Sequence, residues 1–324
     1  MAAPATRYAI PATAPEKDRL AHQYTMMKHV YGWAAPVPAT IDLAQVHAVL
    51  DIAAGTCVWA LDVACAPQIS ARRGSVSIYA CDINRAILPP EDVTDAAGIT
   101  TFEQDVTQPF ACEYHAKFDL VHMRFLTLCL TPEGWRAALA NIHTLLAPGG
   151  QVLLDEVDLI LFKEGQYSAG SSYDLDKYTG GPSWIDKANC MYTSIALRND
   201  FVLGSSFRLG PMLERAGFTV AETEVAPTPI GKLCRKVAGL RGDSIAAYEA
   251  LSADNFIFVL REFATRTLRG GRLEVQRGTR IVEKEALEAV LEEVRQGVRT
   301  EGAVVMCAYF VARKQEMGPF GSGS

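Results

Sequence analysis

The sequence predicts a doubly wound α/β fold built on a mostly parallel sheet. Between residues 47 and 158, short apolar runs typical of strands alternate with stretches of helical periodicity. Acidic residues stand at or near the ends of several of these runs, where the ligands of such sheets bind. Hydrophobic residues make up 49% and charged residues 21% of the chain, as in an ordinary globular protein.

The elements follow in order along the chain. Residues 15–33 carry apolar side chains at roughly helical spacing and predict a helix. Strands are predicted at 47–53, 75–82, 98–105, 118–125 and 151–158, and helices at 58–71 and 131–150. The last of these helices has a proline in its first turn and a Pro-Gly-Gly stop.

The second half of the chain breaks the alternation once. Residues 159–205 hold tyrosines and tryptophan among glycine and serine, which predicts an irregular lid or binding loop. A surface insertion with its own small core is the alternative. A helix followed by a strand is predicted over 208–225, mostly helix over 231–300, and a last strand over 303–314.

Composition argues against several classes of function. A formal net charge of −6 disfavours nucleic-acid binding, and the absence of a long apolar stretch disfavours a membrane span. The N-terminus does not have the pattern of a signal peptide, so we expect a cytoplasmic protein. The eight cysteines form no CxxC pair and the histidines show no metal-ligand spacing, which predicts reduced thiols and no metal site.

The stretch VLDIAAGTCVWALDVA (49–64) reads as a strand, a turn of small residues and the start of a helix. Small residues let the backbone approach a ligand, and the helix offers free N–H groups. A dinucleotide fingerprint would require three glycines, whereas this loop has only Gly55, with Ala53 and Cys57 at positions that are usually glycine. A methyl group at 53 is tolerable if φ is negative there, and a positive φ would cost about 1–2 kcal/mol. Alone, the loop leaves a plain strand-turn-helix equally open.

Two aspartates strengthen the case for a cofactor. Asp82 ends the second predicted strand, where a carboxylate can accept both ribose hydroxyls of an adenosine. Asp105 ends the third, where it can accept a hydrogen bond from an adenine amino group. A helix cap or a solvated strand end remains the alternative for Asp82, and an N-cap for Asp105.

Taken together, these stretches resemble a known motif series. VLDIAAGTCVWALDVA, IYACDI, FEQDVTQPF, FDLVHMRFL and TLLAPGGQVLLDEVD are similar to the motifs of class I S-adenosylmethionine (SAM)-dependent methyltransferases. Trp59, HMR (122–124), PIGKL (229–233) and DRLAHQY (18–24) resemble, more narrowly, the LaeA-like group of fungal methyltransferases and regulators of secondary metabolism. The resemblance spans roughly residues 15–315.

The resemblance implies a Rossmann-like methyltransferase sheet of seven strands, the last antiparallel, with an N-terminal helical cap and inserted lid segments. The organisation expected from it is a flexible lead (1–14), a cap (15–45), a SAM-binding core (46–158, continued at 206–230), a lid or substrate insert (159–205), a helical insert (231–300), a last core strand (301–315) and a vector-like tail (316–324).

The resemblance also implies site residues, with SAM as cofactor and S-adenosylhomocysteine (SAH) as product. The cofactor contacts expected are Asp51, Ala53, Gly55, Thr56, Asp82, Ile83, Asp105, Val106, His122 and Arg124. His122, at the carboxyl end of the fourth strand, is the leading candidate for a general base because an unperturbed imidazole titrates near pH 6.5. A structural histidine is the alternative, and Glu156 is the second candidate base.

Tyr167, Tyr173, Tyr178, Trp184 and Tyr192 are expected to form an aromatic wall for an apolar substrate. Tyr24, His29 and Trp33 are expected over the pocket if the N-terminal helix folds across it as a lid. The function expected is methyl transfer to a small-molecule natural product by in-line displacement, with oxygen favoured over nitrogen or carbon as acceptor atom. The alternatives are a LaeA-type regulator that acts through protein partners, and a SAM-bound cyclase. The N-terminal helix and the 231–300 segment could pair two chains as a homodimer.

Overall fold

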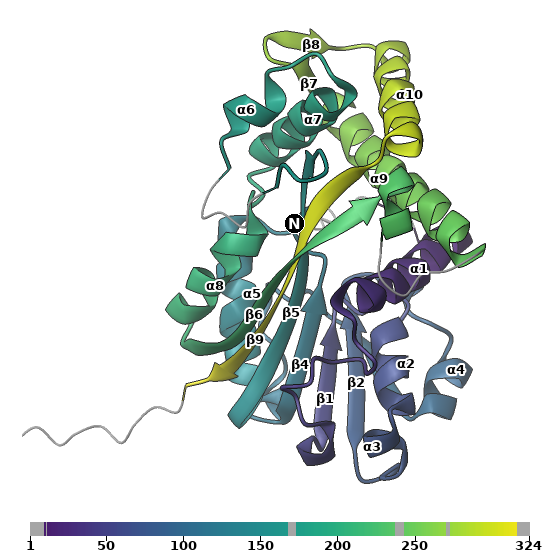
Figure 1. The fold of residues 1–324 in the computed structure, drawn as a ribbon. Coiled ribbons are helices and arrows are strands. Elements are labelled where there is room, and N and C mark those ends of the chain that lie inside the picture. The colour runs from purple at the N-terminus through teal and green to yellow at the C-terminus, as the bar shows by residue number, and fades with distance from the viewer. Residues whose placement is uncertain (1–9, 11, 168–172, 237–242, 270–272, 316–324) are drawn as a thin grey trace, which may run out of the picture.

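The computed structural model describes residues 10, 12–167, 173–236, 243–269 and 273–315. Its centre is a seven-stranded sheet in the order β3-β2-β1-β4-β5-β9-β6 (Figure 1). The strands are β1 (Ala48–Ile52), β2 (Ser77–Asp82), β3 (Ile99–Glu103), β4 (Phe118–Arg124), β5 (Leu146–Phe162), β6 (Phe218–Ile230) and β9 (Ala303–Lys314). β1 to β5 pair in parallel, and β9 is antiparallel to both of its neighbours. The predicted fold class is confirmed.

Helices cover both faces of this sheet, so its central strands are buried on both sides and their sequences are almost continuously apolar. One face packs against α2 (Val58–Cys65), α3 (Pro67–Ser70) and α1 (Ala14–Tyr31), and α4 (Glu91–Ala97) lies nearby. The other face packs against α5 (Pro132–Leu145) and α8 (Ser205–Arg215). α1 lies above the carboxyl end of β1 and beside α9 (Figure 1).

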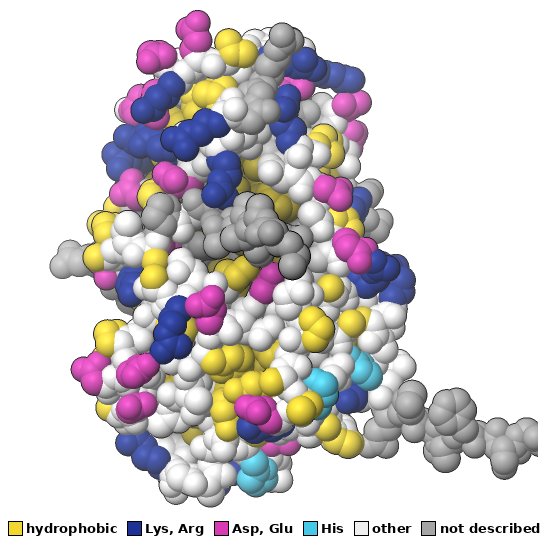
Figure 2. All heavy atoms as spheres, turned by 180° about the vertical axis from the view of Figure 1, so that it is seen from behind, with side chains coloured by type: hydrophobic (Ala, Val, Ile, Leu, Met, Phe, Trp, Pro, Cys, Tyr) yellow, Lys and Arg dark blue, Asp and Glu magenta, His cyan; other side chains and the backbone are white. Residues whose placement is uncertain are grey.

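The segments inserted after β5 form a layer beyond the carboxyl edge of the sheet (Figure 1). They comprise α6 (Leu175–Thr179), α7 (Trp184–Arg198), α9 (Asp243–Arg269), α10 (Lys284–Thr300) and a hairpin of β7 (Leu273–Gln276) and β8 (Thr279–Ile281). Gly297 lets α10 approach α7 closely, because a Cβ there would lie 2.2 Å from Cδ2 of Trp184. Lysine and arginine side chains gather at this end of the face shown in Figure 2.

Several predicted boundaries were wrong. The helix predicted over 58–71 is broken at Ala66, because Pro67 forces the preceding residue out of helical geometry. The helix predicted over 131–150 ends at Leu145, where β5 begins directly and then runs to Phe162, past the predicted end at 158.

The described part of 159–205 is not irregular, because it contains α7, whose N-terminus is closed by a capping box of Ser183 and Asp186. This agrees with the alternative of an insertion with its own core. The predicted tail (316–324) lies outside the described residues. Of the predicted lead (1–14), only residue 10 and residues 12–14 are described.

Candidate functional site

A large cavity runs along the carboxyl edge of the sheet, beneath α1 and α9. Its β1–β4 half is lined by residues at or just after the ends of the first four strands: Ile52, Ala53, Ala54, Gly55, Asp82, Ile83, Ile87, Gln104, Asp105, Val106 and Arg124 to Leu130. Its β5–β6 half is lined by strand residues Val157, Leu159, Thr228, Ile230, Val305 and Cys307 and by α9 residues Ser252, Asn255, Phe256, Val259 and Phe263. α1 contributes Arg19, Leu20, Gln23, Met26 and Met27.

The loop after β1 adopts the left-handed conformation at three positions. Ala53, Gly55 and Cys57 have φ values of 53°, 53° and 55°. From the sequence, alanine at position 53 was expected to be tolerated with a negative φ, and the structure does not have it. Ala53 and Cys57 each cost about 1–2 kcal/mol in this conformation. The turn is held by hydrogen bonds from the Ala54 N–H to the Cys81 carbonyl (2.9 Å) and from the Cys57 N–H to the Ala54 carbonyl (2.8 Å).

Asp82 joins this loop to the end of β2. Its Oδ2 accepts a hydrogen bond from the Gly55 N–H at 3.0 Å, and its Oδ1 accepts one from the Asn84 N–H at 2.9 Å. Burial raises the pKa of the carboxyl to about 6, although these backbone hydrogen bonds oppose the shift. A carboxylate has about four acceptor positions, so Asp82 keeps acceptor capacity in the wall of the cavity.

Asp105 lies two residues beyond the end of β3 rather than at its last residue. Its Oδ1 accepts hydrogen bonds from the backbone N–H and the hydroxyl of Thr107, both at 2.8 Å. No hydrogen bond from a described residue reaches its Oδ2. Since Asp105 and Val106 both line the cavity, the structure brings them to the same place as Asp82 and Ile83.

Arg124, the last residue of β4, is a buried cation in the cavity wall. Its guanidinium lies 4.8 Å from the centre of the Tyr24 ring, and its Nη1 has no hydrogen-bond partner among the described residues. Burial lowers its pKa, whereas the nearby Asp51 and Asp155 raise it. Among the described residues, Nη1 is therefore a buried donor in the cavity wall that can still form a hydrogen bond.

His122 lies two residues inside β4 and does not line the cavity. Its Nδ1 is 2.8 Å from Oδ1 of Asp51, and its ring stacks on Trp59 with the ring centres 4.0 Å apart. The side chain is almost completely buried, and burial lowers its pKa. The structure therefore favours the alternative of a structural histidine. Asp51 lies behind the cavity with it, and Thr56 is also absent from the lining.

Glu156, the second candidate base, is likewise engaged by the fold. Its Oε1 accepts a hydrogen bond from the Leu126 N–H at 2.7 Å, and its Oε2 accepts from the Thr127 hydroxyl at 2.6 Å and N–H at 3.1 Å. Burial raises its pKa to about 8. Glu156 does not line the cavity but holds the loop after β4, which does.

The expected aromatic wall is not where the sequence suggested. None of its five members lines the main cavity, nor do Tyr24, His29 and Trp33, which were expected over it. Tyr24 and Tyr173 donate hydrogen bonds to Asp62 and Asp158. The ring of His29 contacts Tyr248, that of Trp33 contacts Tyr31 and Tyr309, and that of Tyr178 contacts Phe162. Trp184 packs against Gly297, Tyr192 is buried in the core and Tyr167 is exposed. His29 and Tyr167 border a separate pocket with Pro227 and Leu233. Four of the eight rings, Tyr173, Tyr178, Trp184 and Tyr192, pack in the interior of the inserted layer, where burial favours them.

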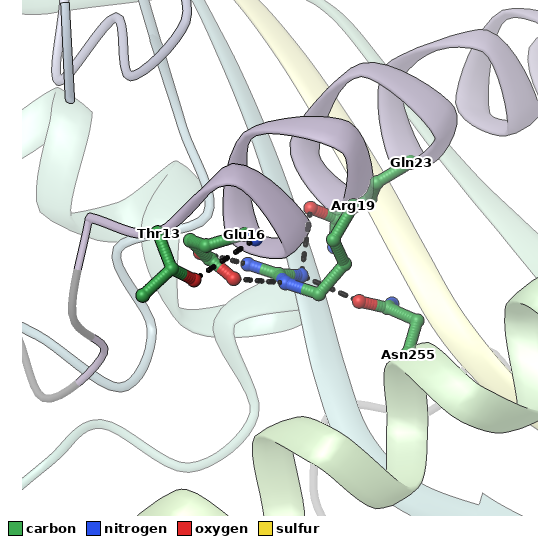
Figure 3. A network of polar contacts seen from close by, with 5 residues as sticks. All are labelled: Thr13, Glu16, Arg19, Gln23 and Asn255. Atoms are coloured by element: carbon green, nitrogen blue, oxygen red, sulfur yellow. Dashed lines mark hydrogen bonds and ion pairs between the residues drawn. The ribbon is translucent and has the colours of Figure 1, made fainter.

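Residues of α9 and α1 that the sequence reasoning missed line the cavity in their place. Phe256, Val259 and Phe263 recur at helical spacing, which indicates an apolar stripe but not what that stripe faces. Where α1 meets α9, Arg19 forms ion pairs with Glu16 and donates hydrogen bonds to Asn255 and Gln23 (Figure 3).

Over the residues that the structure describes, no helix is long and apolar enough to cross a membrane. The same part of the chain has no group of three or more His, Cys, Asp or Glu residues that could hold a metal ion.

The segment that matches a known protein family contains the residues of the β1–β4 half of the cavity. Residues 49–150 match the family profile described as "Methyltransferase domain". The chain is 33% identical to methyltransferase str3 of Strobilurus tenacellus over 51% of its own length and 54% of the relative. It is 27% identical to N-methyltransferase tcpN of Claviceps purpurea over 47% of its length and 52% of the relative. The chain thus spans about half the length of these curated relatives.

Among solved structures, a putative sarcosine dimethylglycine methyltransferase from Galdieria sulphuraria aligns with 95% of this chain and 92% of its own. The TM-score of that alignment is 0.46 and the sequence identity is 14%.

Proposed function

We propose that the chain is a SAM-dependent methyltransferase that transfers a methyl group to a small molecule bound in the β5–β6 half of the cavity. The observation that carries the proposal is the series of groups at successive strand ends, namely Gly55, Asp82, Asp105 and Arg124. All four line one cavity and fall within the segment that matches a methyltransferase domain. The adjoining β5–β6 half provides space for an acceptor next to that series.

The β1–β4 half fits SAM residue by residue. Asp82 would accept the ribose hydroxyls, Ile83 and Val106 would pack on the adenine, and Oδ2 of Asp105 would accept a hydrogen bond from the adenine amino group. The backbone of Ala53 and Gly55 would border the methionine portion. Nη1 of Arg124, which lacks a partner among the described residues, fits the methionine carboxylate, because a buried guanidinium is best satisfied by a carboxylate.

SAM, when bound, supplies a methyl group on a sulfonium that is open to in-line displacement. The chain's own contribution is to hold donor and acceptor in line and to exclude water, which is the main source of rate in such a transfer. Glu156 contributes by holding the loop from Leu126 to Thr127 against the cavity. Arg124 adds a fixed positive charge at the junction of the two halves.

Oxygen remains the acceptor atom that we propose. His122 and Glu156 are both engaged inside the fold. In the described lining of the β5–β6 half, the side chains that titrate are Arg19, which is a cation, and Cys307, whose pKa is raised by burial. A phenol or enol that ionises readily in water needs no base from the protein. Nitrogen is the second candidate, because the relative from Claviceps purpurea is named an N-methyltransferase. The narrower LaeA-like grouping, cytoplasmic location and homodimer stay predictions.

Titration calorimetry with SAH tests the proposal. We expect micromolar or tighter binding to the intact chain, and Asp82→Asn should weaken it by at least about tenfold, the loss expected from charge-assisted hydrogen bonds. Asp119→Asn is the matched control, because Asp119 also accepts two backbone hydrogen bonds, from His47 and Ala48, but at the amino ends of the strands. Lack of SAH binding by the unmodified chain at high micromolar concentration would overturn the proposal.

A further inference from the structure

The β5–β6 half of the cavity is apolar almost throughout, with polar side chains concentrated at one place. Its walls include Val157, Leu159, Phe256 and Val305. The hydroxyl groups of Thr228 and Ser252 line it too, but each is used within the fold. The Thr228 hydroxyl donates to the Ala226 carbonyl, and the Ser252 oxygen accepts from the Gly231 N–H. The remaining polar side chains are Arg19 and Gln23 of α1 and Asn255 of α9.

These three residues form an oriented cluster (Figure 3). Nε and Nη2 of Arg19 donate to the two carboxylate oxygens of the fully buried Glu16, at 2.6 and 2.7 Å. Nη1 of Arg19 donates to Oδ1 of Asn255, and to Oε1 of Gln23 at 3.5 Å. Glu16 fixes the guanidinium, and the guanidinium in turn fixes both carboxamides.

The direction of the two carboxamides follows from the chemistry of arginine. A guanidinium has donors and no acceptor, so the oxygens of Gln23 and Asn255 must face Arg19. Their amide –NH2 groups are then turned away from Arg19. No described residue accepts a hydrogen bond from Nε2 of Gln23 or Nδ2 of Asn255. Two half-buried amide groups that line an apolar cavity are therefore left with N–H donors to offer.

We propose that Gln23 and Asn255 bind a neutral carbonyl oxygen of the methyl acceptor. The acceptor is then an apolar molecule that carries a ketone, ester or amide. The N–H donors of Gln23 and Asn255 require a hydrogen-bond acceptor atom on the ligand. An ammonium group has none, so it is disfavoured at this position. Arg19 is ion-paired with Glu16, and the groups that face the cavity are the –NH2 groups of two neutral carboxamides, which suit a carbonyl better than a carboxylate. This inference rests on the proposed function, because it assigns the acceptor of that same cavity.

The test uses a matched pair of probes on SAH-loaded protein. Benzophenone and diphenylmethane have the same skeleton and no ionisable group, and they differ in the central group, a carbonyl in the first and a methylene in the second. Calorimetry should give tighter binding of the ketone by about 10-fold or more, because a site built to bond an oxygen discriminates against the analogue that lacks it.

Two near-isosteric variants assign the effect. Asn255→Asp and Gln23→Glu keep an oxygen for Arg19 and nearly the same side-chain size, but they replace the N–H donors with acceptors. Each should reduce or abolish the preference for the ketone while leaving SAH affinity within about twofold. Gln45→Glu, at the exposed amino end of β1, changes the net charge equally and should retain the preference.

The outcomes separate the inference from the proposed function. Equal affinity for the two probes, no binding of either probe by SAH-loaded protein, or a preference that survives both substitutions overturns the carbonyl assignment. Failure of the unmodified chain to bind SAH overturns the proposed function instead. SAH affinity also reports whether each variant is folded, so a loss of ketone preference with SAH affinity retained supports the inference.

Discussion

Replacement of Ala53 by glycine tests whether the loop after β1 stores backbone strain. Ala53 has a φ of 53°, in the left-handed region that alanine enters at a cost of about 1–2 kcal/mol and glycine enters freely. Two effects oppose the gain. A glycine makes folding about 0.4–1 kcal/mol less favourable than an alanine, because it gives the unfolded chain more conformational entropy to lose. The half-buried methyl group is worth about 0.4 kcal/mol, half of the value for full burial.

The balance predicts that Ala53→Gly stabilises the chain by about 0.5 kcal/mol, or raises Tm by about 1–2 °C for a domain of this size. Two other alanines bracket the effect. Ala116 has a φ of 50° in an exposed turn at the amino end of β4, so Ala116→Gly should stabilise by about as much or slightly more. Ala54 is buried and is not among the described residues with positive φ, so Ala54→Gly should destabilise by about 1–2 kcal/mol.

The measurements are urea denaturation at constant m-value and thermal unfolding of the four proteins side by side. Ala53→Gly and Ala116→Gly should move the midpoint upward and Ala54→Gly downward. Ala53 lines the cavity and Ala116 does not. Of these two substitutions, only Ala53→Gly should therefore alter SAH affinity, by a few-fold at most. If Ala53→Gly destabilises as much as Ala54→Gly, the strain argument is refuted.

Three further predictions concern buried titratable groups. Because the Asp82 pKa is raised to about 6, protonation should weaken SAH binding by about tenfold between pH 7 and pH 5; a flat calorimetric profile would contradict this. The pKa of Asp155 is raised to about 7, chiefly by burial. Between about pH 4 and pH 7 the folded chain therefore holds a proton that the unfolded chain releases. The stability that this proton contributes is lost as the pH rises from about 4 to 7. Asp155→Asn can still accept from the Tyr31 hydroxyl and should remove a slope of up to about 1.4 kcal/mol per pH unit from urea unfolding; parallel curves would count against it. His122→Asn can still donate to Asp51 and should leave the shape of the pH–turnover profile unchanged, whereas loss of its acid limb would restore His122 as a base.

The parallel strands and the positions of Asp82 and Arg124 were predictable because they depend on local patterns. Alternation of short apolar runs with helices identifies the parallel strands, and parallel strands bring their carboxyl ends to one edge. A residue at such an end therefore lies near the others without further information about packing. The same reasoning placed Asp105 in the right region, although β3 ends two residues earlier.

The contact of His122 with Asp51 could not be predicted because it depends on register. His122 and Arg124 point to the same side of β4, but His122 lies opposite Asp51 of β1 and beneath Trp59, whereas Arg124 stands at the last residue of the strand. Register between strands is set by tertiary pairing, which the sequence of one strand does not contain. The aromatic residues of 159–205 were misplaced for a similar reason, since periodicity does not distinguish a ring that faces a ligand from one that fills a core.

Helix α1 has a consequence for how the two ligands influence each other. Leu20 lies over the loop after β1, where a Cβ on Gly55 would be 3.1 Å from Cδ1 of Leu20. Gln23, one turn further along α1, lines the cavity beside Asn255. One helix thus covers both proposed binding sites, so a ligand that orders this helix meets part of the entropic cost of binding the other ligand. Linkage requires the effect to be reciprocal: an acceptor should tighten SAH by the same factor by which SAH tightens the acceptor.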